Sequence, residues 1–360
     1  MSIVLQKYSS YSVSIAKDTP VDKTITGTSE DVQQYLVHII NDAVTPPKGQ
    51  QQIRGQYFKF RSLSERVASN LKAIVLDKSN TVWDEKVKDN AIKLLEVEKE
   101  VQKDIQAMGK DIRKGSLLQI KCLINNEITI VLVKIDDKTY LDEEVMKLKQ
   151  GLPLDTRVQK LAIIKFDDIG QDISLLLSDT NSTISRYWRS DFIVAEPLRD
   201  SKTNTNSAFN AIDKLLQKKI KPKSKQDYYF IRNQLIISFR QESFNFDNLV
   251  DSIKSYEPLS EELDDKIFSN FISDLQKLPN DSKNPFDTQF DIEPKTIKAR
   301  LNNNKIMIDE HFELNVKGEV NDLKTRLGVG IDPKSKRKYV KIYSDEGYNT
   351  FEKDFPEANS

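Results

Sequence analysis

The sequence has one cysteine, two histidines and eleven glycines among 360 residues, and each scarcity excludes a kind of chemistry. Cys122 has no second cysteine with which to form an internal disulfide, which fits a reducing compartment, and its apolar neighbours predict a buried side chain. His38 and His311 lie far apart without a cysteine or glutamate at ligand spacing, so neither a zinc site nor a histidine general base is expected. Gly328 and Gly330 lack the third glycine and the helix of a phosphate loop, which disfavours nucleotide hydrolysis. We expect no cofactor.

Long apolar runs are also missing. The run over residues 128–133 is far too short to span a bilayer, and the first residues show no apolar core followed by a small-residue cleavage site. We therefore expect no membrane segment and a cytoplasmic location. Hydrophobic residues make up 38% and charged residues 31% of the chain, a balance typical of globular proteins, and the length suits two or three domains.

Charge is balanced overall but segregated along the chain. The formal net charge is +0, yet residues 214–225 contain six lysines and no acid, and the turn over residues 332–338 is also strongly basic. Local potential rather than net charge attracts a polyanion, so nucleic acid is the first partner to consider. The alternative is that these lysines are ordinary solvated surface that keeps the protein soluble.

Hydrophobic periodicity predicts helices and strands in separate blocks, which is typical of the α+β class. Helices are expected over residues 28–45, 62–76, 82–108, 206–220, 226–241, 246–254 and 261–278. Strands are expected over residues 3–5, 11–15, 117–122, 128–135, 161–166, 172–177, 306–308, 312–316 and 339–343. Asn125 and Asn126 predict a hairpin turn, and in the third helix Glu98 is expected to face solvent.

These blocks predict an N-terminal strand and helix region with a central antiparallel sheet, a helical middle section and a C-terminal β-hairpin region. We expect an α+β domain over residues 1–200, a helical section over 201–285 and a basic, strand-rich region over 286–360. The polar stretch 279–285 marks the second boundary because it combines proline, asparagine and serine between two periodic segments.

One enzymatic pattern is present. Glu127 begins a predicted strand, and Asp136 and Lys138 follow its end, which resembles the acidic residues and Asp-X-Lys element with which some nucleases hold Mg²⁺. Such sites need carboxylates that converge from neighbouring strands, whereas about eight strand residues would separate these by roughly 25 Å. Hairpin ends also favour aspartate for turn chemistry alone. The sequence therefore favours a non-enzymatic protein.

An aromatic segment combines Arg186 and Arg189 with Tyr187, Trp188 and Phe192. The arginines could contact phosphates while the rings stack on bases. The interpretation we favour is that the aromatic side chains are buried and that Arg189 pairs with an acid, because large rings more often fill cores.

The order of these segments resembles a known family. The strand block ending at 161–168, the aromatic segment 187–193, the lysine-rich helical section, the stretch 305–316 and the hairpin to Tyr343 resemble bacterial nucleoid-associated proteins of the NdpA type. The resemblance implies an α+β cytosolic protein that associates with DNA in the nucleoid as a dimer, and it brings no enzymatic motif. The tail 347–360 lies beyond the last strand of that pattern, which leaves open a specialised component of an anti-phage or mobile-element defence locus.

The interpretation that follows is a protein that contacts the phosphate backbone of double-stranded DNA with little sequence preference, since flexible lysines carry affinity without base information. Its alternatives are a Mg²⁺-dependent nuclease acting on foreign DNA and a non-enzymatic module that binds a protein partner. We expect a homodimer, with its seam at the central strands or at 187–193. The expected DNA-binding residues are Lys218, Lys219, Lys221, Lys223, Lys225, Lys334, Lys336, Arg337 and Lys338, followed by Arg186 and Arg189.

Overall fold

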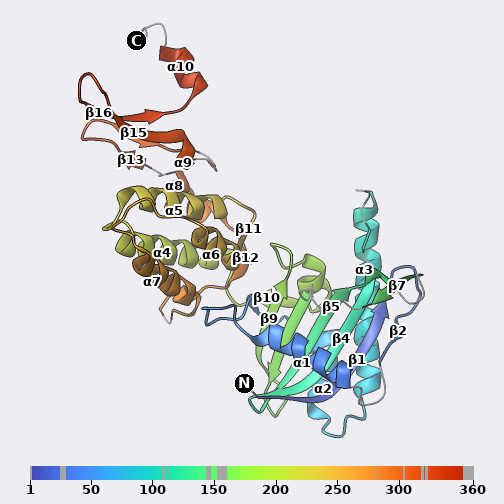
Figure 1. The fold of residues 1–360 in the computed structure, drawn as a ribbon. Coiled ribbons are helices and arrows are strands. Elements are labelled where there is room, and N and C mark those ends of the chain that lie inside the picture. Colours follow the sequence, from blue (N-terminus) through green and yellow to red (C-terminus); the bar gives the residue numbers. More distant parts are fainter. Residues whose placement is uncertain are drawn as a thin grey trace. The chain divides into compact units, whose positions relative to one another are not determined.

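A computed structural model describes residues 2–24, 30–107, 109, 111–112, 114–142, 147–151, 160–281, 283–302, 305–317, 320 and 323–351, with the backbone alone for 138–142 and 147–151. The described residues group into two compact units. The sheet unit comprises residues 1–204, 243–246 and 276–292, and the helical unit comprises residues 205–242, 247–275 and 293–360 (Figure 1). The expected domain boundaries at 200 and 285 stay predictions.

The sheet unit is built on an eight-stranded antiparallel sheet in the order β10-β3-β9-β8-β5-β4-β1-β2. Its strands are β1 (Ile3–Val13), β2 (Val21–Asp22), β3 (Gln56–Phe60), β4 (Gly115–Ile124), β5 (Glu127–Asp136), β8 (Lys160–Phe166), β9 (Asp172–Asp179) and β10 (Ala195–Pro197). Asn125 and Asn126, with φ of 50° and 69°, form the predicted turn between β4 and β5 in the left-handed conformation that such tight turns need. The α+β class is confirmed.

Smaller antiparallel pairs accompany the large sheet. The hairpin of β6 (Lys138–Asp142) and β7 (Lys147–Gly151) lies between β5 and β8 in sequence. β11 (Ser243–Asn245) pairs with β12 (Gln289–Asp291) in the sheet unit. Two short 3-10 turns, η2 (Leu278–Asn280) and η3 (Pro294–Thr296), flank β12 in the chain.

Helices cover both faces of the large sheet (Figure 1). α1 (Glu30–Val44) packs on one face, and α2 (Arg66–Leu76), α3 (Trp83–Gln106) and the π-helical turn η1 (Tyr187–Phe192) pack on the other. Because neighbouring residues of a strand point to opposite faces, the central strands contribute apolar residues to the cores on both faces of the sheet. Cys122 belongs to the face under α1 and is fully buried, as predicted, and burial raises the pKa of its thiol to about 12.

The helical unit contains most of α4 (Ser201–Lys219), α5 (Lys225–Ser238), α6 (Phe246–Lys254) and α7 (Asp265–Lys277), together with the short helices α8 (Lys298–Asn302), α9 (Leu323–Arg326) and α10 (Asp345–Phe351). Buried aromatic rings join α4 to the end of α5, where Phe209 and Phe239 meet edge to face with centroids 5.3 Å apart. Among the helices of the described ranges, none combines the length and apolar character needed to cross a bilayer.

Two hairpins follow α8 in the chain. β13 (Lys305–Met307) pairs with β14 (Glu313–Asn315), and β15 (Leu327–Ile331) pairs with β16 (Lys338–Ile342). The strands expected near 306–308, 312–316 and 339–343 are therefore confirmed, and so are the helices expected over 62–76, 82–108, 206–220, 226–241, 246–254 and 261–278, with small shifts at their ends. β15 was not assigned from the sequence. The residues at 28 and 29 that would cap α1 lie outside the described residues.

Candidate nucleic-acid interface

The first basic run lies at the junction of α4 and α5. Lys218 and Lys219 form the last turn of α4, Lys221 and Lys223 lie in the connecting turn, and Lys225 is the first residue of α5. All five side chains are exposed. Lysines in the last turn of a helix complement its partial negative charge, so part of this run also stabilises α4.

The start of α5 is fixed by a buried carboxylate. Ser224 caps the helix, since its side-chain oxygen accepts the backbone N–H of Asp227 at 3.1 Å. Asp227 itself accepts hydrogen bonds from the Tyr256 hydroxyl at 2.6 Å and from the Leu259 N–H at 2.8 Å. These contacts hold the lysine-bearing turn against the chain segment that follows α6.

Two of these lysines have partners within the helical unit. The Lys219 ammonium lies 3.0 Å from Asp274, and the Lys221 ammonium lies over the Tyr228 ring at 5.2 Å from its centroid. In the described part of the chain, Lys218, Lys223 and Lys225 form no ion pair. Their charges are therefore available to an external anion.

The second basic run forms the turn between β15 and β16, and its acid has a structural role. The Asp332 carboxylate accepts the N–H groups of Lys334 at 3.0 Å and Ser335 at 2.5 Å, which holds the pKa of this carboxyl below its usual range. Lys336 takes the left-handed conformation with φ of 60°. The side chains of Lys334, Lys336, Arg337 and Lys338 are all exposed.

The aromatic segment lies in the core of the sheet unit. Trp188 and Phe192 have no exposed surface, their rings lie 4.9 Å apart, and the Trp188 indole donates to the Leu161 carbonyl at 3.3 Å. The core interpretation of these rings is thus confirmed. Arg189 pairs with Asp291 at 2.9 Å, whereas Arg186 is exposed. Trp188 and Phe192 cannot stack on nucleic-acid bases, because the faces of their rings are covered by the core.

The residues of the nuclease pattern do not converge. Glu127 and Asp136 lie at opposite ends of β5, and the Glu127 carboxylate pairs with Lys165 at 2.6 Å. Asp136 lies 3.6 Å from the Lys134 ammonium, and the Lys138 side chain lies outside the described residues. Among the residues that the structure describes, no three potential ligands gather in a way that could hold a metal ion.

The sheet unit contains a buried charge network that the sequence did not predict. Lys134 on β5, Lys160 on β8 and Asp179 on β9 are successive cross-strand neighbours on the face that α3 covers. The Lys160 ammonium donates to Asp179 and to the Ser185 hydroxyl, both at 2.8 Å. The prediction that Glu98 faces solvent is wrong, since its side chain is buried 3.3 Å from the Lys134 ammonium. Its spacing from Ala91, Leu94 and Leu95 in α3 was a signal of burial.

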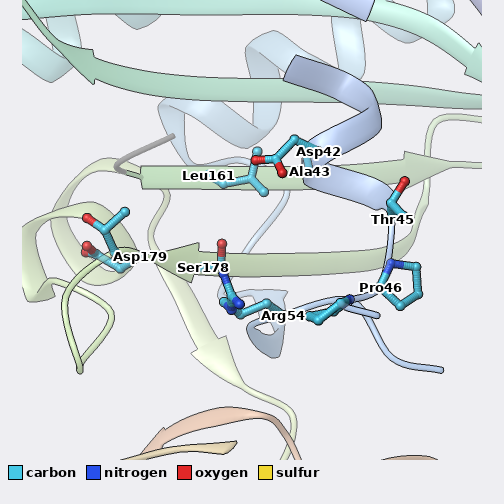
Figure 2. Close-up of a pocket in the computed structure, with 10 residues that line it drawn as sticks. Asp42, Ala43, Thr45, Pro46, Arg54, Leu161, Ser178 and Asp179 are labelled. Carbon is cyan, nitrogen blue, oxygen red and sulfur yellow. The ribbon is translucent and has the colours of Figure 1, made fainter. Parts of the chain in front are cut away.

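A small pocket of about 260 Å³ opens beside the end of α1. Figure 2 shows the side chains of Asp42, Arg54 and Ser178 around it, with Thr45 at the helix end. A carboxylate, a guanidinium and hydroxyls can orient a small polar molecule, but the lining contains no nucleophile paired with a base. We assign no reaction to it.

No family model and no curated protein matches this chain. The resemblance to nucleoid-associated proteins of the NdpA type therefore stays a prediction.

Proposed function

We propose that this protein binds the phosphate backbone of double-stranded DNA with little sequence preference, and that the α4–α5 junction is the principal contact. The observation that carries this proposal is the exposure of Lys218, Lys223 and Lys225 without acidic partners in the described part of the chain, on a junction held by a capped helix. Each lysine that neutralises a phosphate releases counterions, which supplies affinity regardless of base sequence. The β15–β16 turn provides a second cluster of charge.

On this proposal the protein acts in the cytoplasm, associated with the nucleoid, as the family resemblance implies. Specialisation within an anti-phage or mobile-element defence locus is a narrower form of the same role. Arg186 is a supplementary contact because it is exposed, and Arg189 contributes less because Asp291 holds its guanidinium.

The test is a fluorescence-anisotropy titration of two duplexes of unrelated sequence at several salt concentrations. A backbone binder gives nearly equal affinities for both, with a log-log salt slope of about −0.9 per neutralised phosphate. The test variant replaces four lysines of the junction with glutamine: Lys218, Lys221, Lys223 and Lys225. The control variant makes the same replacement at four exposed lysines of the sheet unit: Lys17, Lys23, Lys78 and Lys88.

The junction variant is expected to lose affinity and to have a flatter slope, while the control keeps the wild-type slope. Equal losses in both variants would contradict a defined interface. The same titration with Mg²⁺ tests the nuclease alternative at Glu127, Asp136 and Lys138, and we expect the duplex to stay intact.

A further inference from the structure

The β15–β16 hairpin exposes a face that is apolar apart from Lys338, which lies opposite Ile331. Val329, Ile331, Val340 and Ile342 on that face are 74%, 59%, 45% and 53% exposed, although strand side chains of this kind normally pack on a core. The opposite face is better filled, because the Tyr339 side chain lies over Gly330 and the Lys341 side chain lies over Gly328. A two-stranded sheet with one uncovered apolar face is marginal by itself and gains stability when another element extends or covers it.

The hydrogen-bond register shows which backbone groups of β15 bond to β16 and which point away from it. The Asp332 N–H donates to the Arg337 carbonyl at 2.8 Å, and the Tyr343 N–H donates to the Arg326 carbonyl at 2.9 Å, so these pairs are hydrogen-bonded positions of the ladder. Such positions alternate along an antiparallel pair, which makes Gly328 and Gly330 the residues that bond to β16. The N–H and C=O groups of Leu327, Val329 and Ile331 therefore point to the outer edge of β15.

The outer edge of β15 lacks the features that normally keep a sheet edge solvated. Its sequence, Leu327-Gly-Val-Gly-Ile331, has no charge and no proline, whereas the edge formed by β16 carries Lys338 and Lys341. Lysine on an edge strand opposes pairing with another chain, and its absence permits it. The edge open to strand addition is thus that of β15.

We propose that β15 pairs antiparallel with β15 of a second copy of this chain, about a two-fold axis at Val329, to form a four-stranded sheet. This register places Val329 opposite its own copy and Leu327 opposite Ile331, and it puts the apolar side chains of both hairpins on one face. The strand is self-complementary because the side chains that this register places opposite one another across the axis, Leu327, Val329 and Ile331, are all apolar and uncharged. A two-fold contact of this kind closes as a dimer and leaves no β15 edge for further addition.

The structure narrows the seam expected from the sequence, which stays a prediction. Trp188, Phe192 and Ile193 are fully buried within one chain, and the central strands β5 and β8 have neighbours on both sides. These three side chains and the paired edges of β5 and β8 are therefore closed to a second copy, whereas Tyr187 and Asp191 are partly exposed. The proposed seam of the dimer is instead the outer edge of β15, and its pairing does not require DNA binding.

The test measures the mass of the full chain by light scattering at micromolar concentration without DNA. Val329→Pro removes an outward N–H and places the proline ring on the β15 edge, without removing a bond to β16. Val340→Pro is the matched control, because it makes the same change on the outer edge of β16. Val329→Lys is a second variant that keeps the backbone N–H and adds a charge to the edge.

Wild type and Val340→Pro are expected to have twice the mass of the 41.4 kDa chain, and Val329→Pro and Val329→Lys the mass of one chain. Circular dichroism checks that the variants are folded. The proposal is overturned if wild type is a single chain throughout the range, if both Val329 variants remain dimeric, or if Val340→Pro dissociates as completely as Val329→Pro.

Discussion

Glu98 and Lys134 form an ion pair that is closed to solvent: the Lys134 Nζ lies 3.3 Å from the Glu98 Oε1, and the two side chains are 1% and 2% exposed. Neither oxygen of Glu98 has a hydrogen-bond partner among the described residues. Burial raises the pKa of Glu98, and the nearby ammonium offsets only part of that effect. The pair joins α3 to β5, and the energy of each charge depends on the other.

Lys134→Met is expected to destabilise the protein by about 3 kcal/mol at neutral pH, because it leaves a buried carboxylate without its partner. Because the pKa of Glu98 is higher in the folded state than in the unfolded state, protonation of Glu98 favours folding. That contribution to the free energy of unfolding is fully present below the unfolded-state pKa near 4.3 and is lost as pH rises through the folded-state pKa. The cost of Lys134→Met should therefore be smaller at pH 4.5 than at pH 7.5. Urea unfolding at both values measures it.

The matched control is the double variant Glu98→Gln with Lys134→Met, which removes both charges. Replacing a buried pair as a whole is often nearly neutral, so the double variant should be more stable than Lys134→Met at pH 7.5. Asp136, which lies 3.6 Å from the same ammonium, is partly exposed and can regain water. If Lys134→Met is as stable as the double variant at pH 7.5, the energy of the Glu98 charge does not depend on Lys134.

Asp227 predicts the opposite pH dependence. Burial works to raise its pKa, but hydrogen bonds from Ser224, Tyr256 and the Leu259 N–H outweigh burial, and the pKa is lowered. Its stabilisation is therefore present above the unfolded value near 3.9 and is lost as pH falls through the folded value. Asp227→Asn should cost about 2 kcal/mol at pH 7 and progressively less in acid. Tyr256→Phe removes one hydrogen bond and keeps the charge, so it should cost less at pH 7 and retain most of the acid dependence.

Cys122 provides a probe of the sheet unit. Burial raises the pKa of its thiol to about 12, and the side chain has no exposed surface, so the reactive thiolate is suppressed in the folded state. A thiol reagent should label the native protein slowly and the urea-unfolded protein at once. Rapid labelling without denaturant would show that the sheet opens near β4.

Local patterns predicted most of the fold. The apolar stripe of α1 and the tight turn at Asn125 are encoded by neighbouring residues, so they could be read directly. β3 and β15 were missed because they are short, and β15 contains two glycines that are more typical of turns. These two strands form because they pair with neighbours, β3 with β9 and β10 and β15 with β16, and not because of their local sequences.

Sequence located the basic runs and missed the interactions that modify them. Lysines close in sequence remain close at a helix junction, which made the α4–α5 run visible. The pairing of Lys219 with Asp274 and the burial of Glu98 against Lys134 join residues far apart in the chain. Glu98 was assigned to the surface by residue type, although its position in α3 continues the buried stripe.

The β15–β16 turn gives the last prediction, which asks whether both basic runs bind one duplex. Replacing Lys334, Lys336, Arg337 and Lys338 with glutamine keeps Asp332, whose carboxylate holds the turn, and should flatten the salt slope by about 0.9 for each phosphate that the variant no longer neutralises. Combined with the four substitutions at the α4–α5 junction, the two reductions in slope should add if both runs bind the same DNA. An unchanged slope and affinity in the turn variant alone would remove this turn from the interface while leaving the junction proposal intact.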